Sequence, residues 1–254
     1  MDTVSVDFHY YPEKYDDAPK KLNLFERTLY PDIDQANQTK RKSYFLKRVI
    51  DLIGSSLAIL LFAPVICFIA ILIKITSKGP VLFRQERLGQ FGTKFNFLKF
   101  RSMILGCDDA IHREYIKKLI TENKPSEEDN SDAQGPVYKI RNDPRITPIG
   151  AFLRKTSLDE LPQLLNVLRG EMSLVGPRPA IPYEFENYDI WHRYRILQVK
   201  PGITGLWQVT GRSSTNFDEM VRLDLKYIHD WSLWLDFKIL LLTPLAVIKG
   251  RGAY

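Results

Sequence analysis

The stretch "LIGSSLAILLFAPVICFIAILI", residues 52–73, decides the fold, because it runs for 22 residues without a charged side chain. This is about the length of an α-helix that crosses the hydrocarbon core of a bilayer. A chain of 254 residues also has room for one substantial domain beside such a segment. We therefore expect a membrane helix over residues 42–78 and a domain formed by the residues that follow.

Two features of this segment bear on how it meets the membrane. Pro64 lies near its middle, and proline bends a helix because it lacks an N–H and clashes with the preceding turn. Ser55 and Ser56 are able to bond backbone groups that a bend frees inside a membrane. Basic residues, which favour the cytoplasmic side, stand at both ends: Arg41, Lys42, Lys47 and Arg48 before the segment, and Lys74, Lys78, Arg84 and Arg87 after it.

A straight span would leave one basic cluster on the far side of the membrane. The sequence therefore favours a re-entrant helix hairpin, broken at Pro64, that enters the bilayer and returns to the same face. A plain kinked spanning helix is the alternative that the residues leave open.

The parts on either side of the helix differ in character. Residues 1–41 mix acids, aromatics and polar residues without a sustained period, which predicts a poorly ordered N-terminal arm. Residues 79–254 alternate short apolar runs with Gly and Pro turns, which predicts a small domain at the membrane face. The fold class expected is α-rich α+β, with a re-entrant membrane helix and surface amphipathic helices.

Within residues 79–254 the pattern predicts three further features. Residues 79–103, "GPVLFRQERLGQFGTKFNFLKFRSM", alternate in hydropathy around glycines and predict a small hairpin. Residues 108–124 predict an amphipathic helix, and the acidic, turn-rich residues 122–136 a mobile loop. Near the C-terminus, Trp231 and Trp234 precede an apolar stretch that suits either a helix at the membrane surface or a core helix.

Charge, cysteine spacing and the absence of common motifs limit the classes of function that the chain could have. The formal net charge is +6, from 36 Lys and Arg against 30 Asp and Glu, so the expected partners are anionic. Cys67 and Cys107 have no spacing typical of a disulfide framework or a zinc site. The four histidines form no metal-ligand pattern, and no Gly-rich nucleotide-binding loop is present.

The adjacent acids Asp159 and Glu160 in "RKTSLDELPQLL", residues 154–165, are the leading candidates for chemistry. Ser157 and Glu160 also match a capping box, which would give the acids a purely structural role. Pro162 opposes that reading, because a helix capped by Ser157 would carry proline at its fifth residue. A helix that begins at Asp159 or just before puts Pro162 in its first turn, where proline is tolerated. Both carboxylates then lie at a helix N-terminus, where phosphate also binds well. From spacing alone, the cap and the active site are equally supported.

Several cations occur in turn-rich, aromatic-flanked contexts that suit binding of phosphate groups. Arginine offers planar paired donors to phosphate oxygens, and two carboxylates among cations suggest a bound Mg²⁺, which takes one or two protein carboxylates and completes its shell with water and substrate phosphates. The candidate cations are Lys99 and Arg101, Arg154 and Lys155, Arg178, Lys200 and Arg212.

Taken together, five stretches resemble the bacterial sugar transferase family, the monotopic phosphoglycosyl transferases. The resemblance runs in unbroken order from about Lys42 to Tyr254 and leaves out the first 40 residues. The stretches are "KRVIDLIGSSLAILLFAPVI", "GPVLFRQERLG", "FLKFRSM", "DPRITPIGAFLRKTSLDELPQLLNVLRGEMSLVGPRP" and "VKPGITGLWQVTGR".

The resemblance implies that a sugar-1-phosphate passes from a UDP-sugar to undecaprenyl phosphate, as the first membrane step of surface glycan synthesis. Asp159 would be the nucleophile that forms an aspartyl-phosphosugar and releases UMP, with Glu160 completing the dyad. Magnesium would bridge Asp159 and the diphosphate. Lys99, Arg154, Arg178 and Arg212 match family positions near the substrate phosphates. The domain over residues 79–254 would then be catalytic and lie on the cytoplasmic face of the bacterial inner membrane.

One residue departs from the family pattern. Many members carry Ser-Pro at the membrane-helix break, whereas this chain has Ala63-Pro64. The proline is retained, but the hydroxyl that bonds a freed carbonyl is absent.

Two other classes of function compete with the transferase. A non-catalytic membrane scaffold would use the dyad as a cap and the basic face to bind anionic lipid. A nucleic-acid binder is suggested by charge alone and ranks last, because no binding motif is present.

Overall fold

The computed structural model describes residues 31–104, 120, 145–197, 199–210 and 216–248, of which residues 31–41, 197 and 248 are described by their backbone alone. The chain divides into two units, Met1–Arg41 and Lys42–Tyr254. The fold presented below is that of the second unit. The helix predicted over residues 108–124 lies outside the described residues except for Ile120, and so does the acidic loop over residues 122–136.

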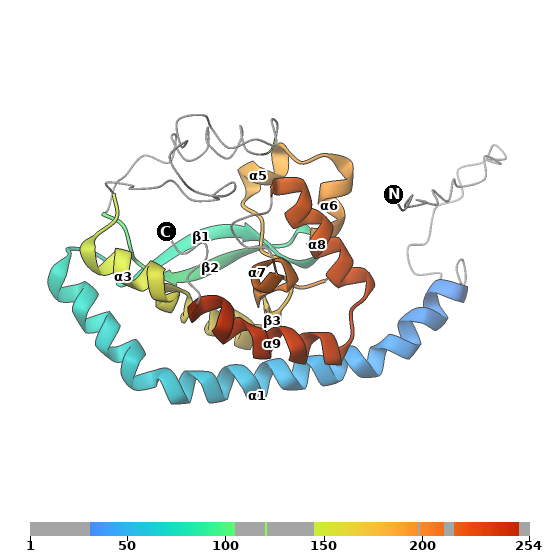
Figure 1. The fold of residues 1–254 in the computed structure, drawn as a ribbon, viewed down its shortest axis with the longest axis horizontal. Coiled ribbons are helices and arrows are strands. Elements are labelled where there is room, and N and C mark those ends of the chain that lie inside the picture. Colours follow the sequence, from blue (N-terminus) through green and yellow to red (C-terminus); the bar gives the residue numbers. More distant parts are fainter. Residues whose placement is uncertain (1–30, 105–119, 121–144, 198, 211–215, 249–254) are drawn as a thin grey trace. The chain divides into compact units, whose positions relative to one another are not determined.

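The apolar segment forms part of one long helix, α1 (Pro31–Thr76), as the absence of charge predicts. Among the described residues, the stretch Lys42–Thr76 is the one helix long and apolar enough to cross a membrane. The helix does not break at Pro64, because the residues on both sides of the proline remain helical. Figure 1 shows instead that α1 turns in its cyan part towards α3. The expected hairpin of two separate helices is therefore replaced by a single bent helix.

The N-terminal half of the apolar segment is attached to the domain by polar contacts. Lys47 Nζ lies 2.6 Å from Asp236 Oδ2 of α9 (Leu233–Ile248). Asp51 Oδ1 accepts hydrogen bonds from Ser173 Oγ and from the backbone N–H of Leu174, at 3.0 and 2.9 Å. Lys47 and Asp51, which precede the apolar run of α1, are thus paired with polar groups of the domain.

The C-terminal half is attached by apolar packing. Ile69 and Ile73 are buried in a cluster with Phe100 and Leu153. Between the two attachments α1 exposes large side chains such as Leu57, Leu60 and Leu61. The segment therefore touches the domain near both of its ends and leaves apolar surface between them.

The predicted hairpin is present. Strands β1 (Leu82–Leu88) and β2 (Lys94–Phe100) pair antiparallel, with Leu82 opposite Phe100 and Leu88 opposite Lys94. A short 3₁₀ turn, η1 (Gln90–Gly92), joins them.

A second, two-stranded sheet is parallel and depends on glycines. Strands β3 (Ser173–Val175) and β4 (Gly202–Thr204) pair so closely that a Cβ at Gly176 or Gly202 would collide with the facing backbone. Short helices lie between and after these strands: α5 (Pro182–Glu186), α6 (Ile190–Leu197), α7 (Leu206–Thr210) and α8 (Phe217–His229).

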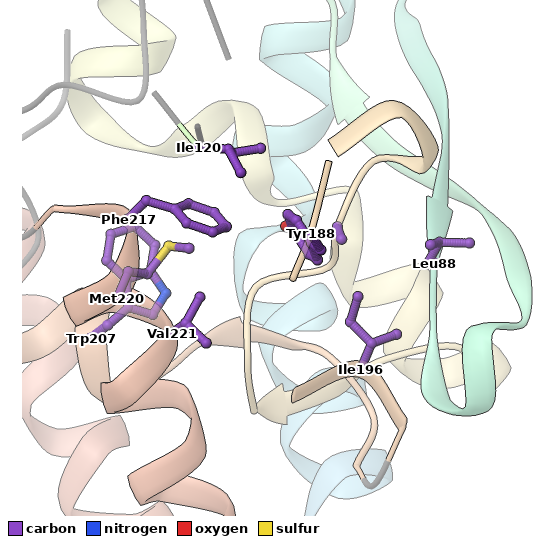
Figure 2. Close-up of a cluster of buried hydrophobic side chains, with 9 residues drawn as sticks. Leu88, Ile120, Tyr188, Ile196, Trp207, Phe217, Met220 and Val221 are labelled. Atoms are coloured by element: carbon purple, nitrogen blue, oxygen red, sulfur yellow. The ribbon is translucent and has the colours of Figure 1, made fainter. Parts of the chain in front are cut away.

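These helices enclose the largest apolar cluster. Figure 2 shows Trp207 from α7 and Phe217, Met220 and Val221 from α8 on one side, with Tyr188, Ile196 and Leu88 further across. Helix α8 is well specified locally, because Asn216 and Glu219 bond each other's backbone N–H groups in a capping box.

Helix α9 has one face packed against the domain and one exposed apolar face, so it is in part the core helix that its sequence allowed, and its place at a membrane surface stays a prediction. Asp236 and Ile239 are buried against the domain, whereas the face that carries Trp234, Phe237 and Leu241 is exposed, with Trp234 72% accessible. These exposed positions recur at helical spacing and form an apolar stripe.

Candidate active site

The acidic pair lies in a 3₁₀ turn between two helices. Helix α3 (Pro148–Thr156) ends at Ser157, whose left-handed φ of 56° reverses the chain into η3 (Leu158–Glu160). Helix α4 (Gln163–Arg169) follows, preceded by Pro162. The prediction of a continuous helix from Asp159 is therefore wrong in detail, since α4 begins at Gln163. Asp159 and Glu160 still lie immediately before that helix.

The capping box that the spacing of Ser157 and Glu160 matches, one of the two readings left open, is not formed. The side chain of Ser157 makes no capping hydrogen bond, because the residue is already used as the left-handed end of α3. Asp159 is 5% exposed, so its carboxylate is buried. A buried carboxylate needs compensation for its charge.

Lys99 of β2 supplies part of that compensation. Its Nζ lies 2.7 Å from Glu160 Oε1 and 3.5 Å from Asp159 Oδ2. The structure thus brings three of the sequence-predicted site residues, Lys99, Asp159 and Glu160, into one cluster. The positive charge stabilises two neighbouring carboxylates that would otherwise repel each other.

The spacing between β2 and α4 is held by Asn166. Its Oδ1 accepts the N–H of Leu98 at 3.1 Å, and its Nδ2 donates to Asn96 O at 2.7 Å and to Glu171 Oε2 at 2.6 Å. Asn166 is completely buried. Because Lys99 directly follows Leu98, this amide sets the position of Lys99 relative to the acidic turn.

Arg154 is anchored just beyond the end of β2. It lies in the last turn of α3, and its Nε donates to Ser102 Oγ at 2.9 Å. Helix α3 approaches this point closely, because a Cβ on Gly150 would collide with the backbone of Ser102. Arg154 therefore comes from the helix that leads into the acidic turn and is fixed beside the strand that carries Lys99.

Arg178 follows β3 in a loop between two prolines. Its Nη2 lies 3.6 Å from Oε1 of the buried Glu184. Arg87 lies nearby, since its Nη1 donates to Pro179 O at 2.6 Å. Burial, and then the charge of Arg178, lowers the pKa of Arg87 to about 10.

The ring of Phe97 connects the two groups of cations. Arg87 Cζ lies 4.7 Å from the ring centroid and Lys99 Nζ lies 5.5 Å from it, both within cation–π range. Lys99 contacts the acids and Arg87 contacts the loop of Arg178. The site therefore extends from the acidic turn to the Pro177–Pro179 loop.

Sequence reasoning missed part of this arrangement. Arg87 and Glu184 are almost completely buried, and no spacing pattern marked either as part of a site. The other predicted residue, Arg212, lies outside the described residues.

The carboxylates of the site fit a magnesium ion only if a substrate supplies further ligands. Among the described residues, no group of three or more His, Cys, Asp or Glu side chains is placed to hold a metal. Asp159 and Glu160 offer the one or two carboxylates that Mg²⁺ takes when substrate phosphates complete its shell. Asp159 would be the ligand, and the metal would supply positive charge to a diphosphate.

Comparison with known proteins gives a family and several relatives. The family model described as Bacterial sugar transferase matches residues 42–250. The chain is 43% identical over 237 residues to "Galactosyl transferase CpsE" of Streptococcus agalactiae, covering 92% of this chain and 49% of the relative. It is 42% identical over 221 residues to "Undecaprenyl-phosphate galactose phosphotransferase" of Salmonella typhimurium, covering 87% and 44%.

A shorter relative matches over most of its own length. "Exopolysaccharide production protein ExoY" of Rhizobium meliloti is 41% identical over 208 residues, which cover 82% of this chain and 88% of that protein. By contrast, the chain spans about half the length of the CpsE and Salmonella proteins.

Proposed function

The chain belongs to the bacterial sugar transferase family, and from this premise we propose that it transfers a sugar-1-phosphate from a UDP-sugar to undecaprenyl phosphate. The names of the relatives support undecaprenyl phosphate as the acceptor and a UDP-sugar as the donor. The observation that carries the proposal is the cluster of Lys99, Asp159 and Glu160, in which a buried carboxylate lies beside a second acid and a lysine. The product would start a surface polysaccharide or glycoconjugate.

We propose that Asp159 acts as a nucleophile. A carboxylate oxygen forms a bond to the sugar-bearing phosphorus, and the bond from that phosphorus to the oxygen of UMP breaks. An oxygen of undecaprenyl phosphate then bonds to the same phosphorus, and the bond to Asp159 breaks. Two displacements replace one difficult transfer, since the acyl phosphate formed first is itself a reactive donor.

Charge stabilisation is the main task of the surrounding residues, because phosphoryl transfer involves little other covalent work by the protein. Lys99 pairs with the acids, Arg154 is anchored by Ser102, and Arg178 lies beside Glu184. We propose that these cations and Arg212 bind the phosphates of the donor. We also propose that Asp159, together with those phosphates, holds a magnesium ion. Arginine suits the binding of phosphate because its guanidinium presents paired N–H donors.

We also propose that the membrane segment is re-entrant. Straight from Asp51 to Ile73 an α-helix would extend about 33 Å, enough to cross a bilayer. Yet Asp51 contacts β3 and Ile73 packs with Leu153 of α3, in the same unit of the chain. A spanning helix would need those two attachments on opposite sides of the membrane. The turn of α1 in Figure 1 and the exposed stripe of α9 support a re-entrant segment, and we propose that it enters from the cytoplasmic face of the inner membrane.

The topology is tested by labelling cysteines at positions 5 and 125 in a chain whose Cys67 and Cys107 are replaced by serine. We expect both positions to react only with a membrane-permeant reagent in intact cells, because both would lie in the cytosol. Opposite accessibility of the two positions would mean a true span and would overturn the re-entrant proposal.

The activity is tested with purified protein, undecaprenyl phosphate and Mg²⁺. UMP release is measured with UDP-glucose, UDP-galactose and UDP-N-acetylhexosamines. We expect release with at least one donor, and we expect it to depend on undecaprenyl phosphate beyond one turnover. If no donor releases UMP or stabilises the protein, while charge reversal of the cations weakens binding to anionic vesicles, the scaffold interpretation replaces the transferase.

A further inference from the structure

Glu184 is a buried acid whose charge the fold of its own helix does not require. It lies in α5 and is 2% exposed. Its Oε2 accepts the N–H of Ile181 at 3.0 Å and lies 3.5 Å from the hydroxyl of Tyr188. A neutral glutamine would provide the same acceptor for Ile181. The negative charge must therefore be compensated, or used, elsewhere.

The other oxygen of Glu184 faces Arg178. Oε1 is buried and makes no hydrogen bond within the described part of the chain, and it lies 3.6 Å from Arg178 Nη2. Burying an ionised carboxylate is costly unless a cation lies close to it. Arg178, with Arg87 behind it, holds the pKa of Glu184 below its ordinary value despite burial.

Arg178 is partly covered and partly exposed. Its side chain is 22% exposed, whereas Glu184 is covered. A guanidinium carries five N–H donors in a fixed plane, so one edge is able to face Glu184 while the other donors remain for a ligand. An ion pair on one side of the plane restricts the rotation of the whole group.

Among the described residues, the charges around this pair do not balance. Arg87, Arg178 and Arg195 act on Glu184. The other acid that they meet is Asp224, which pairs with Arg195, so one positive charge is left over. The excess positive charge is expensive in a largely buried position, and an anionic ligand would relieve it. One phosphate of a nucleoside diphosphate has the right charge for this position.

We propose that Glu184 is a positioning residue whose buried carboxylate orients the guanidinium of Arg178 to receive the donor diphosphate. The inference rests on the proposed function. It assigns to Glu184 no contact with the substrate, so its effect is transmitted through Arg178.

The test is a double-mutant cycle with Glu184→Gln and Arg178→Gln, using the donor that releases UMP best. Losing an electrostatic donor such as Arg178 should lower kcat/KM about 100-fold. Glu184→Gln should lower it roughly tenfold in the wild-type background, mainly through a higher KM for the UDP-sugar, with the KM for undecaprenyl phosphate unchanged. In the Arg178→Gln background the same change should have no further effect, because coupled residues are not additive.

Glu86→Gln is the matched control. It removes one carboxylate from an exposed pair with Lys94 and should leave kcat/KM unchanged. If Glu184→Gln does not fold, Glu184→Asp keeps the charge on a shorter side chain, and its smaller rise in KM should likewise vanish without Arg178.

The outcomes separate the inference from its premise. Equal effects of the Glu184 change in both backgrounds would give Glu184 a structural role only and overturn the inference. An unchanged kcat/KM in Arg178→Gln would remove Arg178 from the site and overturn it as well. In both cases UMP release by the wild-type protein still supports the proposed transfer reaction.

Discussion

Asp159→Asn should lower the rate of UMP release by roughly 10⁴-fold or more, the scale on which enzymes lose activity when a nucleophile is removed. The amide has nearly the same size as the carboxylate but is a much weaker nucleophile. It also carries no charge for Lys99, which lies 3.5 Å away, to stabilise. The measurement is UMP release with and without undecaprenyl phosphate, with thermal unfolding as a check on folding.

Asp230→Asn is the control for this variant. Asp230 ends α8, its side chain is 47% exposed, and it pairs with His229 at the surface. Activity should be unchanged there. Full activity in Asp159→Asn would exclude Asp159 as the nucleophile, whatever the behaviour of the control.

Arg195→Met should cost about 3–5 kcal/mol of the free energy of unfolding, because it breaks a buried ion pair and leaves one charge without its partner. Arg195 Nη1 donates to Asp224 Oδ2 at 2.9 Å, and Nη2 donates to the hydroxyl of Tyr188. Both members of the ion pair are buried, and Tyr188 lies in the cluster of Figure 2. The measurement is denaturant unfolding in detergent.

The loss in Arg195→Met should grow with pH. Burial raises the pKa of Asp224 to about 6, although Arg195 lowers it. Such a raised pKa contributes stability that is present below the unfolded value of 3.8 and is lost as the pH rises through the folded value. Without Arg195 the pKa of Asp224 rises further, so the variant continues to lose stability above about pH 6, where the wild type no longer does.

Arg222→Met is the matched control on the same stretch of chain. Arg222 lies on the exposed side of α8, two residues from Asp224, and its replacement should change stability by no more than about 0.5 kcal/mol. Equal unfolding free energies for the two variants, at all pH values, would show that the buried pair does not contribute to stability.

Local pattern predicted the elements that depend on local chemistry. The uncharged run of residues 52–73 is helical, as expected for an apolar stretch long enough to cross a bilayer. The hairpin of residues 82–100 followed from alternation around Gly89 and Gly92. The acidic pair was correctly expected beside a helix N-terminus, since Pro162 restricts where that helix begins.

What the sequence did not predict depends on tertiary packing. Ser157 adopts a left-handed conformation that ends α3, so it was unable to cap the next helix as its motif suggested. Proline normally disrupts a helix, yet α1 continues through Pro64. Charged side chains are usually exposed, but Arg87, Glu184 and Arg195 are buried. Each of them meets an opposite charge or a hydrogen-bond acceptor from another part of the chain.

In the proposed reaction, Asp159 carries the phosphosugar between the two displacements. The most direct measurement is the mass of the peptide that contains Asp159, after the protein is mixed with a donor it turns over, without undecaprenyl phosphate, and quenched in acid. We expect a peptide heavier by one sugar phosphate, formed with an equal amount of UMP and absent in Asp159→Asn. UMP release on addition of acceptor, with an unmodified Asp159 peptide at every time before and during turnover, would contradict this expectation.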